Sequence, residues 1–150
     1  MRRAQIREEI FKLLFRVEFN EAEDMPAQIA RFFDDLCRRD DDEEDGVKEG
    51  TVRKEDADYI TRKYERIVEK IPELDAQIAS AAKGWKVSRL SKVDLTILRL
   101  AVYEMKYDED IPVGVAINEA VELAKKFSQD ESPSFINGIL AKLAKSVDNE

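Results

Sequence analysis

Residues 91–143 decide the fold, and they read SKVDLTILRLAVYEMKYDEDIPVGVAINEAVELAKKFSQDESPSFINGILAKL. The stretch contains three dense apolar patterns with helical spacing, joined by short loops that carry helix start signals. The first pattern is apolar on nearly every side, which is typical of a helix at the centre of a core. Arg99 and Glu104 interrupt it, and buried charges are tolerated only when they are paired and hydrogen-bonded. We therefore expect each of them to pair with a neighbouring helix.

Each of these three helices has its own start signal. Ser91 and Asp94 stand at the spacing of a capping box. Ile111-Pro112 and Ser132-Pro133 start the other two helices, because proline is favoured in a first helical turn. Gly138 lies inside the last pattern, where glycine costs about 1 kcal/mol relative to alanine. A close crossing with another helix would explain that glycine, and we predict one there.

The residues upstream add four further helical patterns. They predict helices over residues 3–19, from Met25-Pro26, from a cap at Thr51 to about Ile71, and a short one from Pro72. The first carries apolar residues on two opposite sides, which places it between two packing partners. Together with the three helices of residues 91–143, these patterns predict an all-α fold of about seven helices.

Length and composition limit the class of protein. The 150 residues suit one domain, which we divide into an N-terminal bundle over about 1–71 and a C-terminal bundle over about 72–150. No apolar run approaches the length of a membrane helix. The single cysteine, Cys37, excludes a disulfide framework and fits a reducing cytoplasm. The chain has no histidine and no glycine-rich cofactor loop, so we expect no metal, no cofactor and no enzyme activity.

Charge is unevenly distributed along the chain. The net charge of −8 argues against a generally basic surface for nucleic acid, but it leaves room for a local basic patch. Residues 40–45 are six consecutive acids, and their mutual repulsion predicts a solvated acidic loop over about 40–50. Their spacing is not that of calcium ligands. Basic residues gather instead in the first predicted helix, at Arg2, Arg3, Arg7, Lys12 and Arg16.

Four motifs in the last third of the chain resemble those of the bacterial NusB family. They lie at residues 97–104 (ILRLA, then Tyr103-Glu104), 112–115, 117–125 (INEAVELAK) and 135–140 (FINGIL). The first helix adds Arg7-Glu8 and Leu14-Phe15, whereas residues 20–80 match only as a helical pattern. The resemblance implies two three-helix bundles set roughly at right angles. It also implies a cytoplasmic transcription antitermination factor that is not an enzyme.

The resemblance further implies binding to boxA-type single-stranded RNA together with ribosomal protein NusE, in support of transcription of ribosomal RNA operons. Other Nus factors and RNA polymerase would be engaged indirectly. Matched position by position, the RNA contacts implied are Arg2, Arg3, Arg7, Phe15, Lys126, Phe127, Glu131 and Phe135. Basic side chains contact phosphates, aromatic rings stack on unpaired bases, and the acid at Glu131 weakens binding by repulsion. Asp94 matches an acidic position that contacts NusE.

Several alternatives stay open at this point. Phe15 and Phe127 fall on apolar stripes, so each can equally be a core residue. The alternative function is a helical protein–protein adaptor of the same fold with little or no RNA binding of its own. The thin N-terminal arginine cluster and the net acidity favour that alternative, and they predict weak RNA affinity without NusE. Exposed phenylalanines on an RNA-binding face would also suit the seam of a homodimer.

Overall fold

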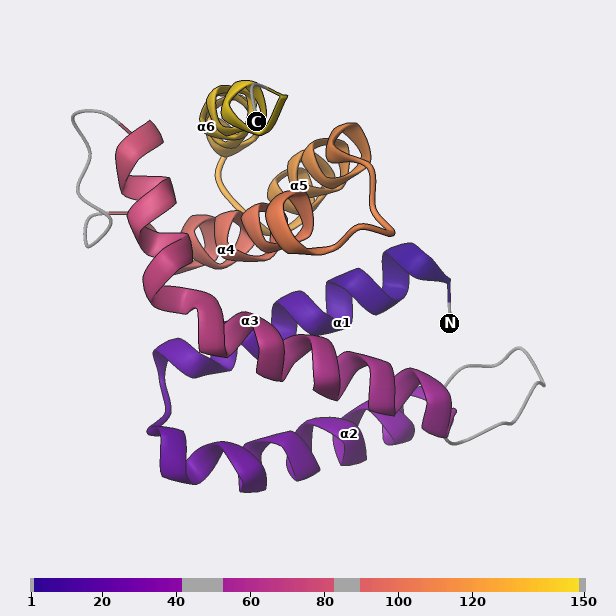
Figure 1. Ribbon diagram of the computed structural model, residues 1–150. Helices are drawn as coiled ribbons and strands as arrows, with labels where there is room; N and C mark the ends of the chain where they lie inside the picture. The colour runs from indigo at the N-terminus through magenta and orange to yellow at the C-terminus, as the bar shows by residue number, and fades with distance from the viewer. Residues whose placement is uncertain (1, 42–52, 83–89, 149–150) are drawn as a thin grey trace. The chain divides into compact units, whose positions relative to one another are not determined.

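The computed structural model describes residues 2–41, 53–82 and 90–148, and every regular element in these residues is a helix (Figure 1). The six α-helices are α1 (Arg3–Phe15), α2 (Met25–Asp41), α3 (Lys54–Ala81), α4 (Lys92–Tyr107), α5 (Val113–Phe127) and α6 (Ser132–Asp148). Two 3-10 turns, η1 (Arg16–Glu18) and η2 (Ala22–Asp24), separate α1 from α2. The predicted all-α fold is confirmed, with six α-helices in the described residues instead of about seven.

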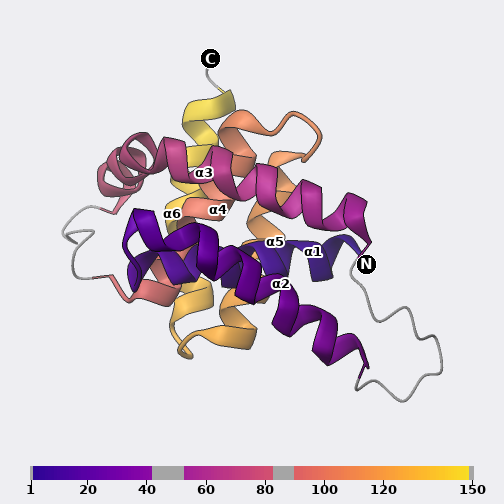
Figure 2. The same ribbon diagram turned by 90° about the horizontal axis from the view of Figure 1, so that it is seen from below.

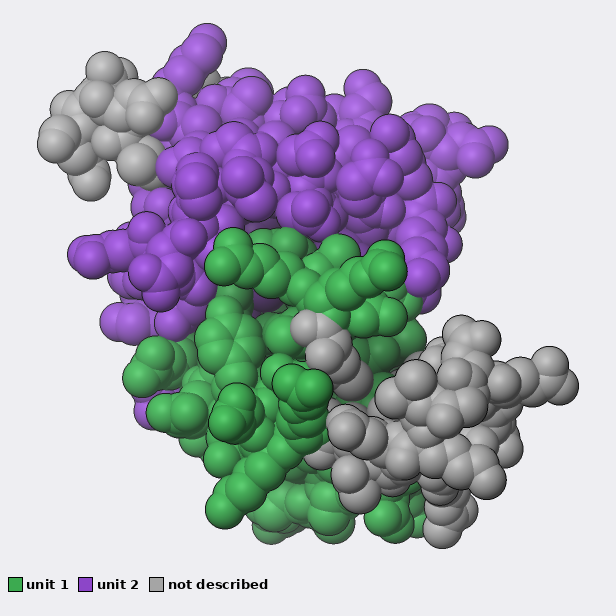
Figure 3. Space-filling view, turned by 90° about the vertical axis from the view of Figure 1, so that its right-hand side faces the viewer, with its two compact units in different colours: residues 1–66 green, residues 67–150 purple. Residues whose placement is uncertain are grey.

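The chain divides into two compact units, Met1–Arg66 and Ile67–Glu150 (Figure 3). Unit 1 contains α1, α2 and the first part of α3, and its buried apolar side chains include Ile10, Leu13, Leu14, Phe32, Leu36 and Ile60. Arg16 links α1 to α2, because its guanidinium donates to the side-chain oxygen of Gln28 at 3.1 Å and lies 5.3 Å from the Phe32 ring centroid. Burial raises the pKa of the Tyr64 phenol, and the Glu65 carboxylate adds to that rise.

Helix α3 corrects the prediction that one helix ends at about Ile71 and another starts at Pro72. Pro72 lies inside a single continuous helix. A proline in a helix interior lacks the N–H that would bond to the carbonyl four residues earlier, at a cost of about 3 kcal/mol. The apolar stripe offsets that cost, because it continues through the proline at spacings of three and four. Ile67, Leu74 and Ile78, on either side of Pro72, are all 0% exposed.

Unit 2 is built around α4. Every residue from Leu95 to Met105 is buried, which confirms a central helix. Helices α5 and α6 pack against α4 and against each other (Figure 2). The Arg99 guanidinium donates to both carboxylate oxygens of Asp75 in α3, from Nε at 2.8 Å and from Nη2 at 2.9 Å. The pairing predicted for Arg99 is therefore confirmed, and it joins α4 to α3 by a bidentate ion pair.

Four helices begin at or directly after the predicted start signals, at Met25, Lys92, Val113 and Ser132. The prediction of a close helix crossing at Gly138 is wrong. Among the described residues, no heavy atom beyond its own helix lies within 4 Å of where a Cβ atom of residue 138 would stand, so none of their helices crosses close to it. Nothing in the structure explains this glycine.

The acidic run also differs from the prediction of a loop. Helix α2 continues to Asp41, so the first two of the six acids are helical, and the other four lie outside the described residues. The predicted cap at Thr51 lies outside them as well. Among the described residues, no helix is both long enough and apolar enough to cross a membrane.

Candidate nucleic-acid interface

The predicted RNA contacts fall on two helical regions, one in each unit. The first, which we term the α1 face, consists of Arg2 at the N-cap, Arg3 and Arg7 in the first half of α1, and Phe15 at its opposite end. The second is the α5–α6 segment, residues 125–135, which includes Lys126, Phe127, Glu131 and Phe135. Asp94, the predicted protein contact, lies in unit 2 in the first turn of α4.

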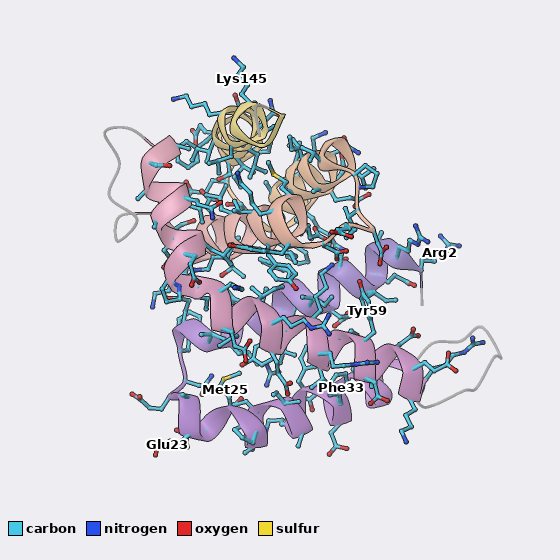
Figure 4. All side chains as sticks on the ribbon, viewed as in Figure 1. Arg2, Glu23, Met25, Phe33, Tyr59 and Lys145 are labelled. Atoms are coloured by element: carbon cyan, nitrogen blue, oxygen red, sulfur yellow. The ribbon has the colours of Figure 1, made fainter. Side chains whose placement is uncertain are left out.

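The α1 face presents positive charge at a helix start. Arg2 is the N-cap residue, and its backbone N–H donates to the side-chain oxygen of Gln5 at 2.9 Å. Arg2 and Arg3 are exposed, whereas Arg7 is half-buried. The side chain of Arg2 points away from the helix (Figure 4). Because the first turn of α1 contains no acid, its partial positive charge adds to the attraction of these arginines for anions.

Phe15 is the middle member of a column of three aromatic rings. Its ring centroid lies 6.3 Å from that of Phe11 and 5.0 Å from that of Phe19. Phe11 is buried, Phe15 is half-buried and Phe19 is 60% exposed, so the column runs from the core of unit 1 to solvent. The spacing i, i+4, i+8 in the sequence was the signal for this column, but it did not reveal that Phe19 is its exposed end.

The α5–α6 segment is a short turn between two helix ends. Ser128 caps the C-terminus of α5, where its N–H donates to Ala124 O at 2.9 Å. Residues 129–131 follow, and α6 begins at Ser132, whose N–H donates to Gln129 O at 3.0 Å. With so few connecting residues, the end of α5 and the start of α6 are held close together.

Basic and aromatic side chains lie side by side in this segment. The Lys126 ammonium is 5.4 Å from the ring centroid of Phe127, within the range of a cation–π contact. Lys126 and Glu131 are exposed, whereas Phe127 and Phe135 are half-buried. Each phenylalanine thus contributes to packing and still has part of its surface in contact with solvent. The core and surface roles that the sequence left open for Phe127 are therefore compatible.

Asp94 makes side-chain contacts that the sequence did not predict. The predicted cap is present, since the Asp94 N–H donates to Ser91 Oγ at 3.0 Å. Among the described residues, however, the Asp94 carboxylate does not bind back to Ser91, and its partners are two serines of the α5–α6 segment, Ser128 and Ser132. One carboxylate oxygen accepts a hydrogen bond from Ser128 Oγ, and the other accepts one from Ser132 Oγ at 3.0 Å. We term Asp94, Ser128 and Ser132 the serine–carboxylate cluster.

Two further observations bear on what the interface can bind. An open groove of about 500 Å³ between α5 and α6 is lined by apolar and uncharged polar residues, Asn118 and Asn137 among them. None of its lining residues is charged, so the groove offers no cationic side chain to a phosphate. In the described part of the chain, no group of three or more acidic, histidine or cysteine side chains is placed to hold a metal ion.

The fold and this geometry define an all-helical protein with exposed arginines at the start of α1 and an exposed lysine beside a partly exposed ring in the α5–α6 segment. The chain matches the NusB family model over residues 4–145. The transcription antitermination protein NusB of Agathobacter rectalis is 47% identical over 144 residues, which cover 96% of this chain and 100% of that protein. The chain belongs to the NusB family.

Two solved structures agree with this assignment of the fold. T. maritima NusB superposes with a TM-score of 0.79 at 32% identity, over 97% of this chain and 92% of that one. A chain in the crystal structure of antitermination factors NusB and NusE in complex with dsRNA gives a TM-score of 0.72 at 22% identity, over 97% of this chain and 99% of that one. At that identity, the second likeness establishes the shared fold alone.

Proposed function

We propose that this chain is a transcription antitermination factor that binds boxA-type single-stranded RNA together with ribosomal protein NusE. In this role it acts in the cytoplasm on transcription of ribosomal RNA operons, in contact with other Nus factors and RNA polymerase through the complex, and it performs no catalysis. The function named for the relative at 47% identity supports the role in antitermination. The structurally similar chain crystallised with NusE and dsRNA supports NusE as a protein partner and RNA as the class of nucleic acid.

The observation that carries the proposal is the pairing of charge and ring in the α5–α6 segment. Lys126 is exposed beside the partly exposed ring of Phe127. Proteins that bind single-stranded nucleic acid use cations to follow the phosphates and rings to stack on the bases. Unpaired bases can reach such a ring, whereas the bases of a duplex are stacked on each other.

Asp94 suits contact with a basic protein even though two serines already bind it. An ionised carboxylate has about four sites for hydrogen bonds, and the serines occupy one on each oxygen. Asp94 is half-buried, so part of its surface remains accessible. Opposite charge at such a position favours orientation and rapid association of the partner. NusE would supply positive charge that this chain, at a net charge of −8, lacks.

The alternative of a protein–protein adaptor rests on a specific observation. Of the three arginines on the α1 face, Arg2 and Arg3 are exposed and Arg7 is half-buried, and the chain as a whole is acidic. Such a surface attracts phosphates weakly. An adaptor of the same fold would bind NusE through Asp94 and leave RNA contacts to other proteins.

One titration separates the two functions. A boxA-type RNA and a scrambled RNA are each titrated with the full chain, with and without NusE, at several salt concentrations. We expect preference for the boxA-type RNA, stronger binding in the presence of NusE, and an affinity that falls as salt rises. Binding to NusE with no preference between the two RNAs under any condition would contradict RNA recognition and support the adaptor.

A further inference from the structure

The serine–carboxylate cluster joins distant parts of the sequence beside the α5–α6 segment. Ser128 and Ser132 are 34 and 38 residues from Asp94 in the chain. The two serines are also in contact with each other, since their Oγ atoms lie 2.8 Å apart. Ser128 stands at the end of α5 and Ser132 at the start of α6, so one carboxylate binds both ends of the turn.

None of these contacts is needed to cap a helix. The start of α4 already has a cap in Ser91, which accepts the Asp94 N–H. Ser132 lies at the start of α6 and is 4% exposed, and its hydroxyl donates to Asp94 in α4. This hydrogen bond therefore joins α6 to α4. It also gives the buried hydroxyl a partner, without which its burial would be costly.

The cluster sets the position of the side chains that the proposed function requires. Ser128 directly follows Lys126 and Phe127, and Ser132 directly follows Glu131. The backbone of Phe135 is tied to the same turn, because its N–H donates to Glu131 O at 3.1 Å. A binding site keeps its geometry only when the residues that contact the ligand are held by others packed behind them.

We propose that Asp94, Ser128 and Ser132 are positioning residues that hold the α5–α6 segment in the conformation that binds RNA. The inference rests on the proposed RNA-binding function and extends it to residues that act through Phe127, Lys126 and Phe135. It gives Asp94 a role in RNA recognition in addition to its predicted contact with NusE. The Asp94 carboxylate would then act both in RNA recognition and in contact with NusE.

The test compares Ser128→Ala with Ser91→Ala in the full chain. Both remove one serine hydroxyl near Asp94, but only Ser128→Ala removes a bond to its carboxylate. Affinity for a boxA-type RNA is measured in the presence of NusE, at a temperature where circular dichroism shows every variant folded. We expect Ser128→Ala to weaken RNA binding about tenfold, as for loss of a hydrogen bond to a charged group. Ser91→Ala removes the cap of α4 and should lower stability, but it leaves both bonds to the Asp94 carboxylate. It should therefore keep RNA affinity within about twofold of the wild type.

Three further readouts distinguish positioning from a general loss of stability. Ser128→Thr keeps a hydroxyl and should restore most of the affinity. The dependence of affinity on salt should be unchanged in Ser128→Ala, because serine carries no charge to a phosphate. In a double-mutant cycle, Asp94→Ala combined with Ser128→Ala should cost little more than the larger single loss, since both remove the same bond.

Each possible result bears on the proposal. Wild-type affinity in Ser128→Ala, equal losses in Ser91→Ala and Ser128→Ala, or additive losses in the cycle would overturn the positioning role while the proposed function stands. Absence of RNA binding by the wild type with NusE would instead overturn the proposed function, and the positioning role with it. A loss of RNA affinity in Ser128→Ala but not in Ser91→Ala, restored in Ser128→Thr, would establish the positioning role.

Discussion

The α1 face and the α5–α6 segment present similar side chains on different supports. On α1, Arg2 and Arg3 project from the first turn of an exposed helix start. In the α5–α6 segment, Ser128 directly follows Phe127 and, together with Ser132, binds the Asp94 carboxylate. Attraction of a guanidinium for a phosphate acts over about a Debye length and tolerates a mobile charge. Stacking of a ring on a base does not tolerate displacement, so the better-supported region is the one suited to read bases.

The difference separates two kinds of effect on RNA binding. Substitution of an arginine of the α1 face should change how strongly the affinity depends on salt. Substitution of Phe127, or of a serine that positions it, should change the affinity by a similar factor at every salt concentration. The second effect presupposes that the packing of unit 2 holds the α5–α6 segment in place.

The largest effect is expected from Asp75→Ala, which removes the bidentate ion pair with Arg99. Arg99 is 9% exposed, and breaking a buried ion pair by removing one member typically costs 3–5 kcal/mol. The side chain of Asp75 is 27% exposed, so we expect the lower end, about 3 kcal/mol in the free energy of unfolding. Chemical denaturation measures this, with Glu73→Ala, an exposed acid in the same helix, as the control.

Hydrogen exchange of Asp75→Ala then tests whether the two regions are supported independently. Amides of α4, α5 and α6 should exchange faster, whereas those of α1 should change little, because local stability follows local packing. Equal acceleration in both units would mean that they open together. In that case the comparison between the α1 face and the α5–α6 segment would lose its structural basis.

Phe127→Leu is expected to have the next largest effect, on RNA binding. Leucine keeps apolar bulk in a half-buried position but has no ring on which a base can stack. Loss of a stacking ring costs about 1–3 kcal/mol per base, and the slope of affinity against salt should not change. Phe33→Leu is the matched control, since Phe33 is a half-buried phenylalanine of α2 outside the predicted interface (Figure 4). Equal RNA affinity in both variants would assign Phe127 to the core alone.

Local signals predicted the helices well, because a cap or a first-turn proline acts within a few residues. Ser91 and Pro112 are examples. Pro72 shows the limit of such signals, since a proline ends a helix only when the flanking residues gain nothing by continuing. Here Ile67 and Leu74 are fully buried on either side, and that burial is a property of the folded chain. The same holds for Gly138, whose surroundings could not be predicted from its neighbours in sequence.

The candidate site was predicted in part, and the missing part is tertiary. The sequence identified Asp94 as a residue of the first turn, and the family resemblance added its expected partner. Neither indicated that its carboxylate binds Ser128 and Ser132, because serines beside a helix start are ordinary caps. Arg99 is a parallel case. The apolar pattern showed that Arg99 needs a partner, but which residue becomes that partner, Asp75, depends on how α3 packs on α4.

A smaller and different effect is expected from Arg7→Ala on the α1 face. Loss of one phosphate contact should lower the slope of log affinity against log salt by about 0.7 for single-stranded RNA. The affinity itself should fall most at low salt. Arg62→Ala, another arginine of unit 1 outside the predicted interface, is the control. A slope equal to that of the wild type would remove Arg7 from the interface and leave the α1 face with Arg2 and Arg3.

The smallest effect is expected from Gly138→Ala in α6, one turn beyond the α5–α6 segment. A Cβ there meets nothing within 4 Å, so alanine should fit without strain and stabilise the protein by about 0.4–1 kcal/mol. The reverse change at exposed Ala141, Ala141→Gly, should destabilise it by a similar amount. Thermal unfolding measures both. RNA affinity should not change in either variant, because the serine–carboxylate cluster ends at Ser132. Weaker RNA binding by Gly138→Ala would show that a partner approaches the bare helix surface, and it would extend the interface along α6.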